Sequence, residues 1–286
     1  MTYALVNGVN IYYETHGSGT PLVFCHEFAG DYRSWESQVG FFSRNYEVIT
    51  YCARGYPPSD VPDSVDLYSQ SQFVNDLKGL LTTLNVEKAH LVGLSMGGNV
   101  ALNFAISFPR MVFSLVVAGT GTGSDEPALF RARVDGMADG MENEGMSFMS
   151  SYLGGPARVQ LKQKDPKGYE VFRNNFMQHS PVGSANTFRG VLKQRPPIYD
   201  LEHKLKSLNI PTLVVIGDED DPCIQPALFM SKNIPSAGLA VFPRSGHAVN
   251  LEEPELFNRT LMDFLIQVER EKWHKKYSGK VDGSLE

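Results

Sequence analysis

Short apolar runs alternate with amphipathic stretches over residues 10–118. Within residues 68–84 the apolar positions recur every three or four residues, which is the spacing of one buried helix face. The runs between such stretches are short and rich in β-branched residues, as in buried strands. The alternation predicts an α/β fold with a mostly parallel, twisted sheet and helices on both faces. The predicted strands are 10–13, 21–26, 47–51, 89–94 and 112–118, and the predicted helices are 68–84 and 96–108.

The pattern changes between residues 124 and 207, where no convincing strand occurs. An amphipathic helix is predicted there from the spacing of Phe130, Val134, Met137 and Met141. The alternation then resumes, with strands at 211–216 and 239–242 and helices at 226–232 and 254–269. We therefore expect an α/β core of residues 1–123 and 208–272, an inserted helical cap of residues 124–207, and a flexible polar tail of residues 273–286.

Composition excludes several functional classes. Of the 286 residues, 42% are hydrophobic and 20% are charged, which rules out a disordered chain. The net charge of −6 argues against nucleic acid or an anionic membrane as the main partner. No apolar run reaches the roughly 18 residues of a spanning helix, and residues 1–10 lack the pattern of a signal peptide. With three cysteines far apart in sequence, the expected location is the cytoplasm.

The strongest chemical signal is Gly93-Leu94-Ser95-Met96-Gly97, at the junction of a predicted strand and a predicted helix. A serine hydroxyl is a weak nucleophile unless it projects from the sheet and a base activates it. A sharp strand-to-helix turn would project Ser95, and glycines on both sides would leave room for neighbouring elements. The free amides at the start of the helix would point at any oxyanion formed there. We predict that Ser95 is a nucleophile.

An acid and a histidine follow in the order that this chemistry needs. Asp218, Asp220 and Asp221 come after the strand 211–216, and His247 follows the strand that ends at Phe242. The carboxyl ends of parallel strands share one edge of a sheet, where open α/β proteins build their sites. His247 would take the proton of Ser95 and return it to the leaving group, while a carboxylate would fix its tautomer.

These motifs resemble the α/β-hydrolase family over residues 3–269. His26-Glu27-Phe28 is similar to its His-Gly-x loop, and the segment that begins with Arg54-Gly55 is similar to its Arg-Gly-x-Gly-x-Ser loop. The resemblance implies that Asp220 is the acid, with Asp221 as the runner-up and Asp218 less favoured. It also implies an oxyanion hole formed by the backbone amides of Phe28 and Met96, where one donor contributes roughly 3–4 kcal/mol.

The chain departs from the family pattern at Glu27, where a glycine is usual. We weigh two hypotheses for this side chain: a surface bystander, or a group that restricts or polarises the pocket. His26 is expected to be structural and to tie down its loop. Cys52 stands where an aspartate often precedes Arg54, and Pro57 and Pro58 replace a glycine and its neighbour. Arg54 is therefore expected to make structural hydrogen bonds.

Other chemistries of this fold do not suit the residues present. Epoxide hydrolases and haloalkane dehalogenases resemble the core but need an aspartate nucleophile where Ser95 stands. The histidines are scattered, and neither His-x-x-x-His nor Cys-x-x-Cys occurs, so no metal site is expected. Gly119-x-Gly121-x-Gly123 lacks the spacing of a nucleotide-binding loop, and no cofactor is expected.

The insertion is expected to cover the site and to select the substrate. Its methionines predict a pliable apolar pocket, with Met137 and Met141 in the wall, Glu27 beside them and His179 as a polar contact. Packing of cap helices on the core explains any single methionine at least as well. The leading hypothesis is an esterase or lactonase that uses an acyl-serine intermediate on a small hydrophobic molecule.

Three alternatives share the same residues. A carbon–carbon bond hydrolase would need a cation in the cap to hold a substrate carboxylate, and a perhydrolase shares the wording Ser95-Met96-Gly97. A hydrolase-like receptor would bind a small ligand with little turnover, because such receptors can keep the whole triad. The cations considered for the first alternative are Arg131, Arg133, Arg173 and Arg189. The sequence does not predict an oligomeric state.

Overall fold

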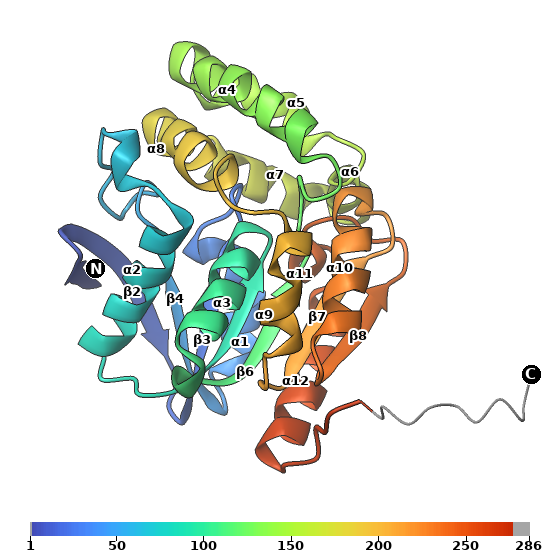
Figure 1. Ribbon diagram of the computed structural model, residues 1–286. Helices are drawn as coiled ribbons and strands as arrows, with labels where there is room; N and C mark the ends of the chain where they lie inside the picture. The colour runs from blue at the N-terminus through green and yellow to red at the C-terminus, as the bar shows by residue number, and fades with distance from the viewer. Residues whose placement is uncertain (1, 277–286) are drawn as a thin grey trace, which may run out of the picture.

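The computed structural model describes residues 2–276, which contain one eight-stranded sheet (Figure 1). The strand order is β1-β2-β4-β3-β5-β6-β7-β8, parallel from β4 to β8 and antiparallel among β1, β2 and β4. The predicted fold class is confirmed. The strands are β1 (Thr2–Val6), β2 (Val9–His16), β3 (Thr20–Cys25), β4 (Tyr46–Tyr51), β5 (Ala89–Leu94), β6 (Val112–Ala118), β7 (Thr212–Gly217) and β8 (Ala237–Phe242).

The central parallel strands β5 and β7 are buried on both faces, which made them visible in the sequence. Every residue of β5 and of β7 is buried. Parallel strands of this kind give continuous apolar runs. One face of the sheet is covered by α1 (Glu36–Phe42) and α12 (Pro254–Glu269), and the other by α2 (Gln70–Thr83), α3 (Met96–Ser107) and α10 (Asp221–Asn233).

Two of the differences from the prediction have local reasons. The pattern did not predict β1, which forms a hairpin with β2 through Asn7 and Gly8, at φ values of 48° and 79°. The Asn-Gly pair, which favours this two-residue turn, was the available signal. Helix α10 begins at Asp221, before the predicted start at Pro226, because it tolerates a proline inside the helix.

Between β6 and β7 the described chain is helical and contains no strand. Residues 124–192 of this helical segment (residues 124–207) lie over the carboxyl ends of the strands, whereas residues 202–206 pack beside α10 (Figure 1). Whether it acts as a separate cap stays a prediction. Its elements are α4 (Pro127–Glu144), η4 (Met146–Met149), α5 (Ser150–Leu153), α6 (Val159–Lys164), α7 (Pro166–Phe176), α8 (Pro181–Asn186), the π-helix η5 (Thr187–Leu192), η6 (Ile198–Leu201) and α9 (Glu202–Lys206).

Residues 273–276 correct the predicted start of the flexible tail. The Trp273 indole donates a hydrogen bond from Nε1 to the carbonyl oxygen of Ser236 at 2.6 Å. Its ring packs edge-on against Phe264, with 4.6 Å between the centroids. This part of the chain is docked beside β8 because the indole finds both an apolar and a polar partner there. The rest of the predicted tail, 277–286, lies outside the described residues.

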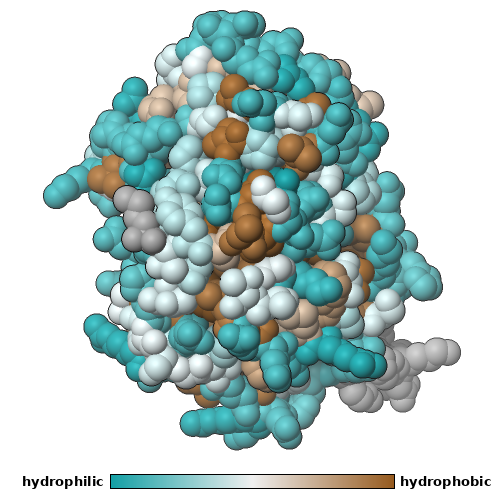
Figure 2. Space-filling model, turned by 90° about the vertical axis from the view of Figure 1, so that its left-hand side faces the viewer, coloured by the Kyte–Doolittle hydropathy of each residue, from teal (hydrophilic) through white to brown (hydrophobic). Residues whose placement is uncertain are grey.

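The helices of the described residues can be compared with the length and apolarity that a membrane-spanning helix needs. On the face shown in Figure 2, apolar side chains form small separate patches among polar ones. Scattered apolar residues of this kind are normal on a protein surface. Within residues 2–276, every helix is too short or too polar to span a membrane.

Candidate active site

Ser95 lies in the sharp turn between β5 and α3. Its backbone has a φ of 55° and a ψ of −109°, a conformation that residues other than glycine rarely adopt. The Ser95 amide donates a hydrogen bond to the carbonyl oxygen of Ala118 on β6 at 2.8 Å, which holds the turn against the sheet. Ser95 is partly exposed, whereas its neighbours Leu94 and Met96 are buried. The turn therefore presents the hydroxyl at the carboxyl end of the sheet.

Glycine is required on both sides of this turn. A Cβ atom at Gly93 would overlap the backbone of Gly97, and one at Gly97 would overlap the backbone of Cys25 at the end of β3. The glycines thus let α3 start directly against the sheet. The first amides of a helix have no partner inside it, so the Met96 amide is available to a developing oxyanion.

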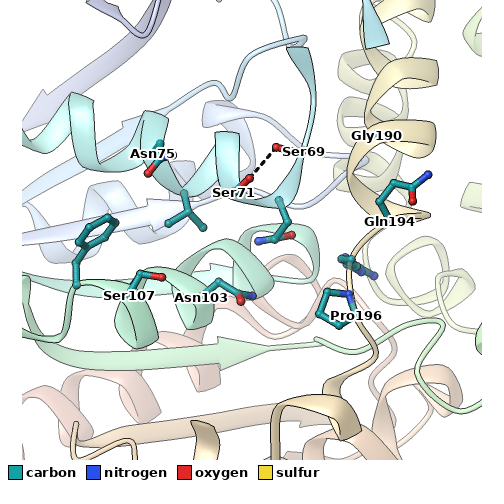
Figure 3. A pocket seen from close by; sticks show the side chains of 12 residues that line it. Ser69, Ser71, Asn75, Asn103, Ser107, Gly190, Gln194 and Pro196 are labelled. Carbon is teal, nitrogen blue, oxygen red and sulfur yellow. Dashed lines mark hydrogen bonds between the residues drawn. The ribbon is translucent and has the colours of Figure 1, made fainter. Parts of the chain in front are cut away.

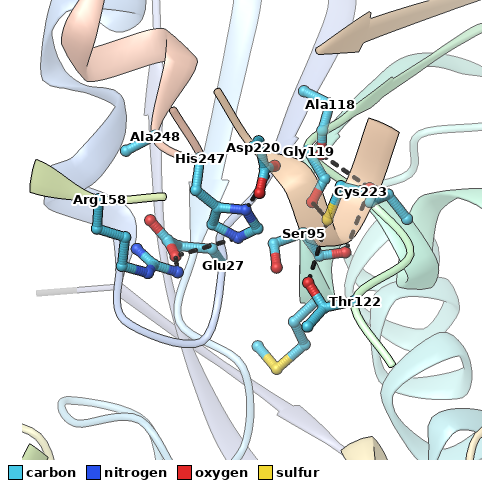
Figure 4. A network of polar contacts seen from close by, with 12 residues as sticks. Glu27, Ser95, Ala118, Gly119, Thr122, Arg158, Asp220, Cys223, His247 and Ala248 are labelled. Carbon is cyan, nitrogen blue, oxygen red and sulfur yellow. Dashed lines mark hydrogen bonds and ion pairs between the residues drawn. The ribbon is translucent and has the colours of Figure 1, made fainter. Parts of the chain in front are cut away.

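His247 and Asp220 meet at the carboxyl ends of β8 and β7 (Figure 4). His247 Nδ1 and Asp220 Oδ2 are 2.8 Å apart, and the two residues are 4% and 1% exposed. A carboxylate only accepts hydrogen bonds, so Nδ1 carries the proton and Nε2 keeps its lone pair. Figure 4 shows Ser95 beside this imidazole. Asp221 is exposed as the first residue of α10, and Asp218 accepts a hydrogen bond from the Ser245 amide.

The loop that carries His247 is held by a residue that the sequence analysis missed. Glu252 accepts hydrogen bonds from the amides of Gly246 at 2.7 Å and Ala248 at 3.1 Å. Burial raises the pKa of this carboxyl. From the other side, the His247 amide donates to the carbonyl oxygen of Ala157 in the helical segment at 2.7 Å. Glu252 had no distinguishing signal, because acidic residues are common at the start of a helix.

Glu27 is buried beside His247 and forms an ion pair with Arg158 of the helical segment. Glu27 is 1% exposed and Arg158 is 7% exposed. Arg158 Nη2 donates to Glu27 Oε2 at 2.5 Å and to the Tyr152 hydroxyl at 2.8 Å. The same Glu27 oxygen lies 3.9 Å from His247 Nε2 (Figure 4). The hypothesis of a surface bystander is therefore wrong for Glu27.

Glu27 and Arg158 compensate each other's charge. Burial alone would raise the pKa of Glu27, but the positive charge of Arg158 and its hydrogen bond outweigh burial and hold this pKa below its ordinary value. Burial alone would lower the pKa of Arg158, and the Glu27 carboxylate reverses that effect. Both groups are therefore charged at neutral pH. Among the described residues, Glu27 Oε1 and Arg158 Nη1 have no hydrogen-bond partner although both atoms are buried.

The loop after β3 is fixed by His26 and Phe28. His26 Nδ1 lies 2.7 Å from the carbonyl oxygen of Glu27, and its Nε2 accepts from the Ala53 amide at 3.0 Å. These partners require a neutral imidazole, and burial lowers the pKa of His26 to about 4. The Phe28 ring packs edge-on against Phe188 of the helical segment, with 4.4 Å between the centroids. His26 thus makes the structural contacts expected of it.

The other residues predicted for the pocket wall lie elsewhere. Met141 is fully buried in the hydrophobic core, and Met137 packs at the edge of the same cluster. The two methionines are four residues apart on α4 and therefore share one face of that helix, which packs on the core. His179 is buried with Nε2 at 3.4 Å from Asp31 Oδ2 and its ring edge-on to Tyr56. None of these three lines the cavity beside His247.

Comparison with known proteins identifies the family. A model described as the alpha/beta hydrolase family matches residues 15–260. The chain belongs to the α/β-hydrolase family. The 2-hydroxy-6-oxononadienedioate/2-hydroxy-6-oxononatrienedioate hydrolase of Paraburkholderia phymatum is 30% identical over 280 residues, which cover 91% of this chain and 92% of that protein.

Two further relatives act on ester-type bonds according to their names. The 3-oxoadipate enol-lactonase 1 of Acinetobacter baylyi is 28% identical over 250 residues, 87% of this chain and 89% of that protein. The structure of a thermophilic esterase from Thermogutta terrifontis superimposes with a TM-score of 0.84 at 26% identity, covering 93% of this chain and 98% of that one. The resemblance to an α/β hydrolase stated from the sequence is confirmed.

A cavity of about 250 Å³ opens beside the Asp220–His247 pair of this α/β hydrolase. A mostly apolar wall with a few polar groups suits a small molecule. The helical segment and the core loops both contribute to the wall, which includes Thr122, Tyr152, Pro156, Ala157, Arg158 and Pro222.

A larger cavity of about 370 Å³ lies between α2, α3 and residues 190–196 (Figure 3). Ser95, Asp220 and His247 are not among the residues that line it. This larger cavity therefore does not coincide with the predicted catalytic residues. The residues that line it include several with hydroxyl or amide side chains, namely Ser69, Ser71, Asn75, Asn103, Ser107 and Gln194.

Cys223 joins Asp220 and His247 in a buried group whose ligand atoms lie within 4.8 Å of one another. Burial raises the pKa of the Cys223 thiol well above its ordinary value. The protonated sulfur lies 3.4 Å from the Gly119 carbonyl oxygen, to which it donates, and 3.1 Å from Thr122 Oγ1. These contacts place Cys223 in the same buried hydrogen-bonded network as Asp220 and His247.

Proposed function

We propose that this α/β hydrolase cleaves a carboxylic ester or lactone of a small, largely hydrophobic molecule through an acyl-serine intermediate. The proposal is carried by the 2.8 Å contact between His247 Nδ1 and Asp220 Oδ2, beside a serine on a strained turn. His247 Nε2 takes the hydroxyl proton as Ser95 Oγ attacks the carbonyl carbon. The proton then passes to the leaving oxygen as the C–O bond breaks. Water hydrolyses the acyl-serine by the same proton path.

The backbone amides of Phe28 and Met96 are proposed to stabilise the oxyanion. Met96 supports this role because it is the first residue of α3, where the amides lack helical partners. Phe28 supports it because the aromatic contacts of its ring fix the loop after β3. Each such donor contributes roughly 3–4 kcal/mol to the barrier reduction.

An ester or lactone substrate is supported by the cavity and by two relatives. The cavity beside His247 has an apolar wall that includes Pro156, Ala157 and Pro222. By their names, one relative is an enol-lactonase and another an esterase, at 28% and 26% identity. Both reactions are acyl transfers from oxygen, which the proposed residues catalyse without any added group.

A carbon–carbon bond hydrolase is the second candidate. It is favoured by the relative named a 2-hydroxy-6-oxononadienedioate hydrolase, at 30% identity, and by a buried cation, Arg158, near His247. It is disfavoured because Glu27 already neutralises that cation. The arginines expected to hold a substrate carboxylate are exposed or bonded elsewhere, namely Arg131, Arg133, Arg173 and Arg189.

Active-site labelling and a substrate panel test the proposal. The purified protein should react with a fluorophosphonate and turn over short p-nitrophenyl esters, whereas Ser95→Ala should lose both while its circular dichroism is unchanged. Aryl esters, lactones and vinylogous 1,5-diketones should be assayed side by side. Preference for the diketones would move the assignment to carbon–carbon cleavage. Labelling without turnover of any class would favour a receptor, and the absence of both would overturn the proposal.

A further inference from the structure

The Glu27–Arg158 ion pair has contacts that the acyl-transfer steps do not use. It joins the loop after β3 to the helical segment, and both partners are buried. One oxygen and one nitrogen of the pair have no partner among the described residues. Leaving charged groups partly unsatisfied in a buried place destabilises a protein. The pair is therefore poorly suited to stabilise the fold, and this points to a role at the reacting centre.

The pair borders the space that a substrate must enter. His247 Nε2 is the atom that gives the proton to the leaving oxygen, and Glu27 Oε2 lies 3.9 Å from it. Arg158 and Tyr152 both line the cavity beside His247. The Glu27 carboxylate thus lies beside the nitrogen that transfers the proton, and the Arg158 guanidinium lies in the wall of the cavity.

We propose that Arg158 forms an anion-binding subsite which Glu27 occupies from within the chain, so that the enzyme selects esters and lactones with no negative charge beside the scissile bond. This inference rests on the proposed function and specifies its substrate class. A substrate carboxylate would be repelled by Glu27 and would find Arg158 already paired. Specificity built by rejection of the wrong partner is common in binding sites.

Arg158 has a second anchor that holds it in place without Glu27. Its Nη2 donates to the Tyr152 hydroxyl at 2.8 Å, and its guanidinium carbon lies 4.5 Å from the centre of the Tyr152 ring. A cation over an aromatic face is attracted to it. Removing the charge of Glu27 should therefore leave a positioned, unpaired guanidinium, which recognises a carboxylate well.

Three matched esters, one neutral and two anionic, measure this selection. The substrates 4-nitrophenyl butyrate and 3-carboxy-4-nitrophenyl butyrate differ by one carboxylate in the leaving group, and mono-4-nitrophenyl succinate places the charge in the acyl group. For each ester, kcat/KM is first divided by the rate constant for its hydrolysis by hydroxide, so that differences in intrinsic reactivity cancel. The readout is this value for each anionic ester divided by the value for the neutral ester. For the wild-type enzyme, both ratios should be below about 0.1, a discrimination within the range that one charge contact provides.

Glu27→Gln should raise at least one of the two ratios tenfold or more, because it keeps the shape of the side chain and removes its charge. Adding Arg158→Gln should reverse that gain, since the guanidinium binds the carboxylate. Glu253→Gln is the matched control, because it removes one charge from the Lys164–Glu253 ion pair, which also joins the helical segment to the core, at 2.6 Å. The control should leave both ratios within twofold of the wild type.

Wild-type enzyme that hydrolyses the anionic and neutral esters equally well would overturn the inference, even if no variant folds. An active Glu27→Gln variant with ratios within twofold of the wild type would overturn it as well. In both cases the fluorophosphonate label and the turnover of 4-nitrophenyl butyrate would remain, so the proposed function would stand. Loss of label and turnover in the wild type would instead contradict the proposed function itself.

Discussion

Two buried arginine–carboxylate pairs differ in how completely their atoms are bonded. Arg54 donates to Asp76 from Nε at 2.5 Å and from Nη2 at 2.8 Å, and its Nη1 donates to the Leu67 carbonyl oxygen at 2.9 Å. Arg158 contacts Glu27 through one nitrogen, and its Nη1 has no partner among the described residues. The first pair fastens α2 to the loop after β4, whereas the second lies beside the reacting atoms.

This difference shows that burial alone does not separate structural from functional charges. Arg54 and Arg158 are 2% and 7% exposed, so both would be classed as buried ion pairs. What separates them is the number of donor and acceptor atoms left without a partner. Unsatisfied buried polar atoms are rare in folded proteins, and each needs an explanation. Here the explanation is the proximity of Glu27 and Arg158 to His247.

The largest expected effect is the loss of turnover when the proposed catalytic acid beside the Glu27–Arg158 pair is changed. Asp220→Asn should lower kcat for 4-nitrophenyl butyrate by about 10⁴-fold, because the amide can no longer hold His247 in the tautomer that accepts the Ser95 proton. The melting temperature should change little. Asp221→Asn is the matched control and should change kcat less than twofold, since that carboxylate is exposed. The opposite pattern would move the acid to position 221.

The second effect distinguishes the Arg54–Asp76 pair from the Glu27–Arg158 pair by its contribution to the free energy of unfolding. Arg54→Met should lower the free energy of unfolding by about 3–5 kcal/mol, because it leaves the Asp76 carboxylate buried without its partner. The folded enzyme should keep the wild-type ratio of anionic to neutral ester hydrolysis. Urea unfolding measures the free energy of unfolding, and hydrolysis of the three esters measures the ratio. Adding Asp76→Leu should recover part of the lost stability. A changed ester ratio would show that the two pairs are not distinct in function.

A smaller effect tests the loop that carries Glu27. The pKa of His26 is about 4 in the folded protein because of burial, and an unfolded histidine has a pKa near 6.5. Between these values the unfolded chain binds more protons, so stability is complete above pH 6.5 and falls as the pH drops towards 4. The loss from His26 is about 3 kcal/mol. Urea unfolding at several pH values should show a shallower decline for His26→Asn than for the wild type. Equal slopes would contradict the assignment.

The part of the site built on strand ends could be predicted from local sequence. Ser95, Asp220 and His247 each follow a buried apolar run, and such runs are visible without knowing the fold. The pairing of Asp220 with His247 then follows from the parallel order of β7 and β8. The short strand β1 escaped because it carries exposed apolar residues such as Leu5 instead of a buried run.

The part of the site built by the helical segment could not be predicted in this way. Arg158 and Glu27 are separated by 131 residues, and nothing in the local sequence links them. Met137 and Met141 have the composition of a pocket wall but pack into the core, because helical spacing shows which residues share a face and not what that face contacts. The glutamate in place of a glycine at position 27 was the one available signal that a buried cation lay nearby.

The docking of Trp273 also determines what optical methods will detect. The chain has two tryptophans, and both pack on the face of the sheet covered by α1 and α12. Trp35 stacks near Phe24, with 4.8 Å between the ring centroids, while Trp273 contacts Phe264. Intrinsic fluorescence will therefore report the melting of that layer and remain unchanged when the helical segment alone rearranges. A tryptophan introduced at Phe188 would give the helical segment its own emission signal.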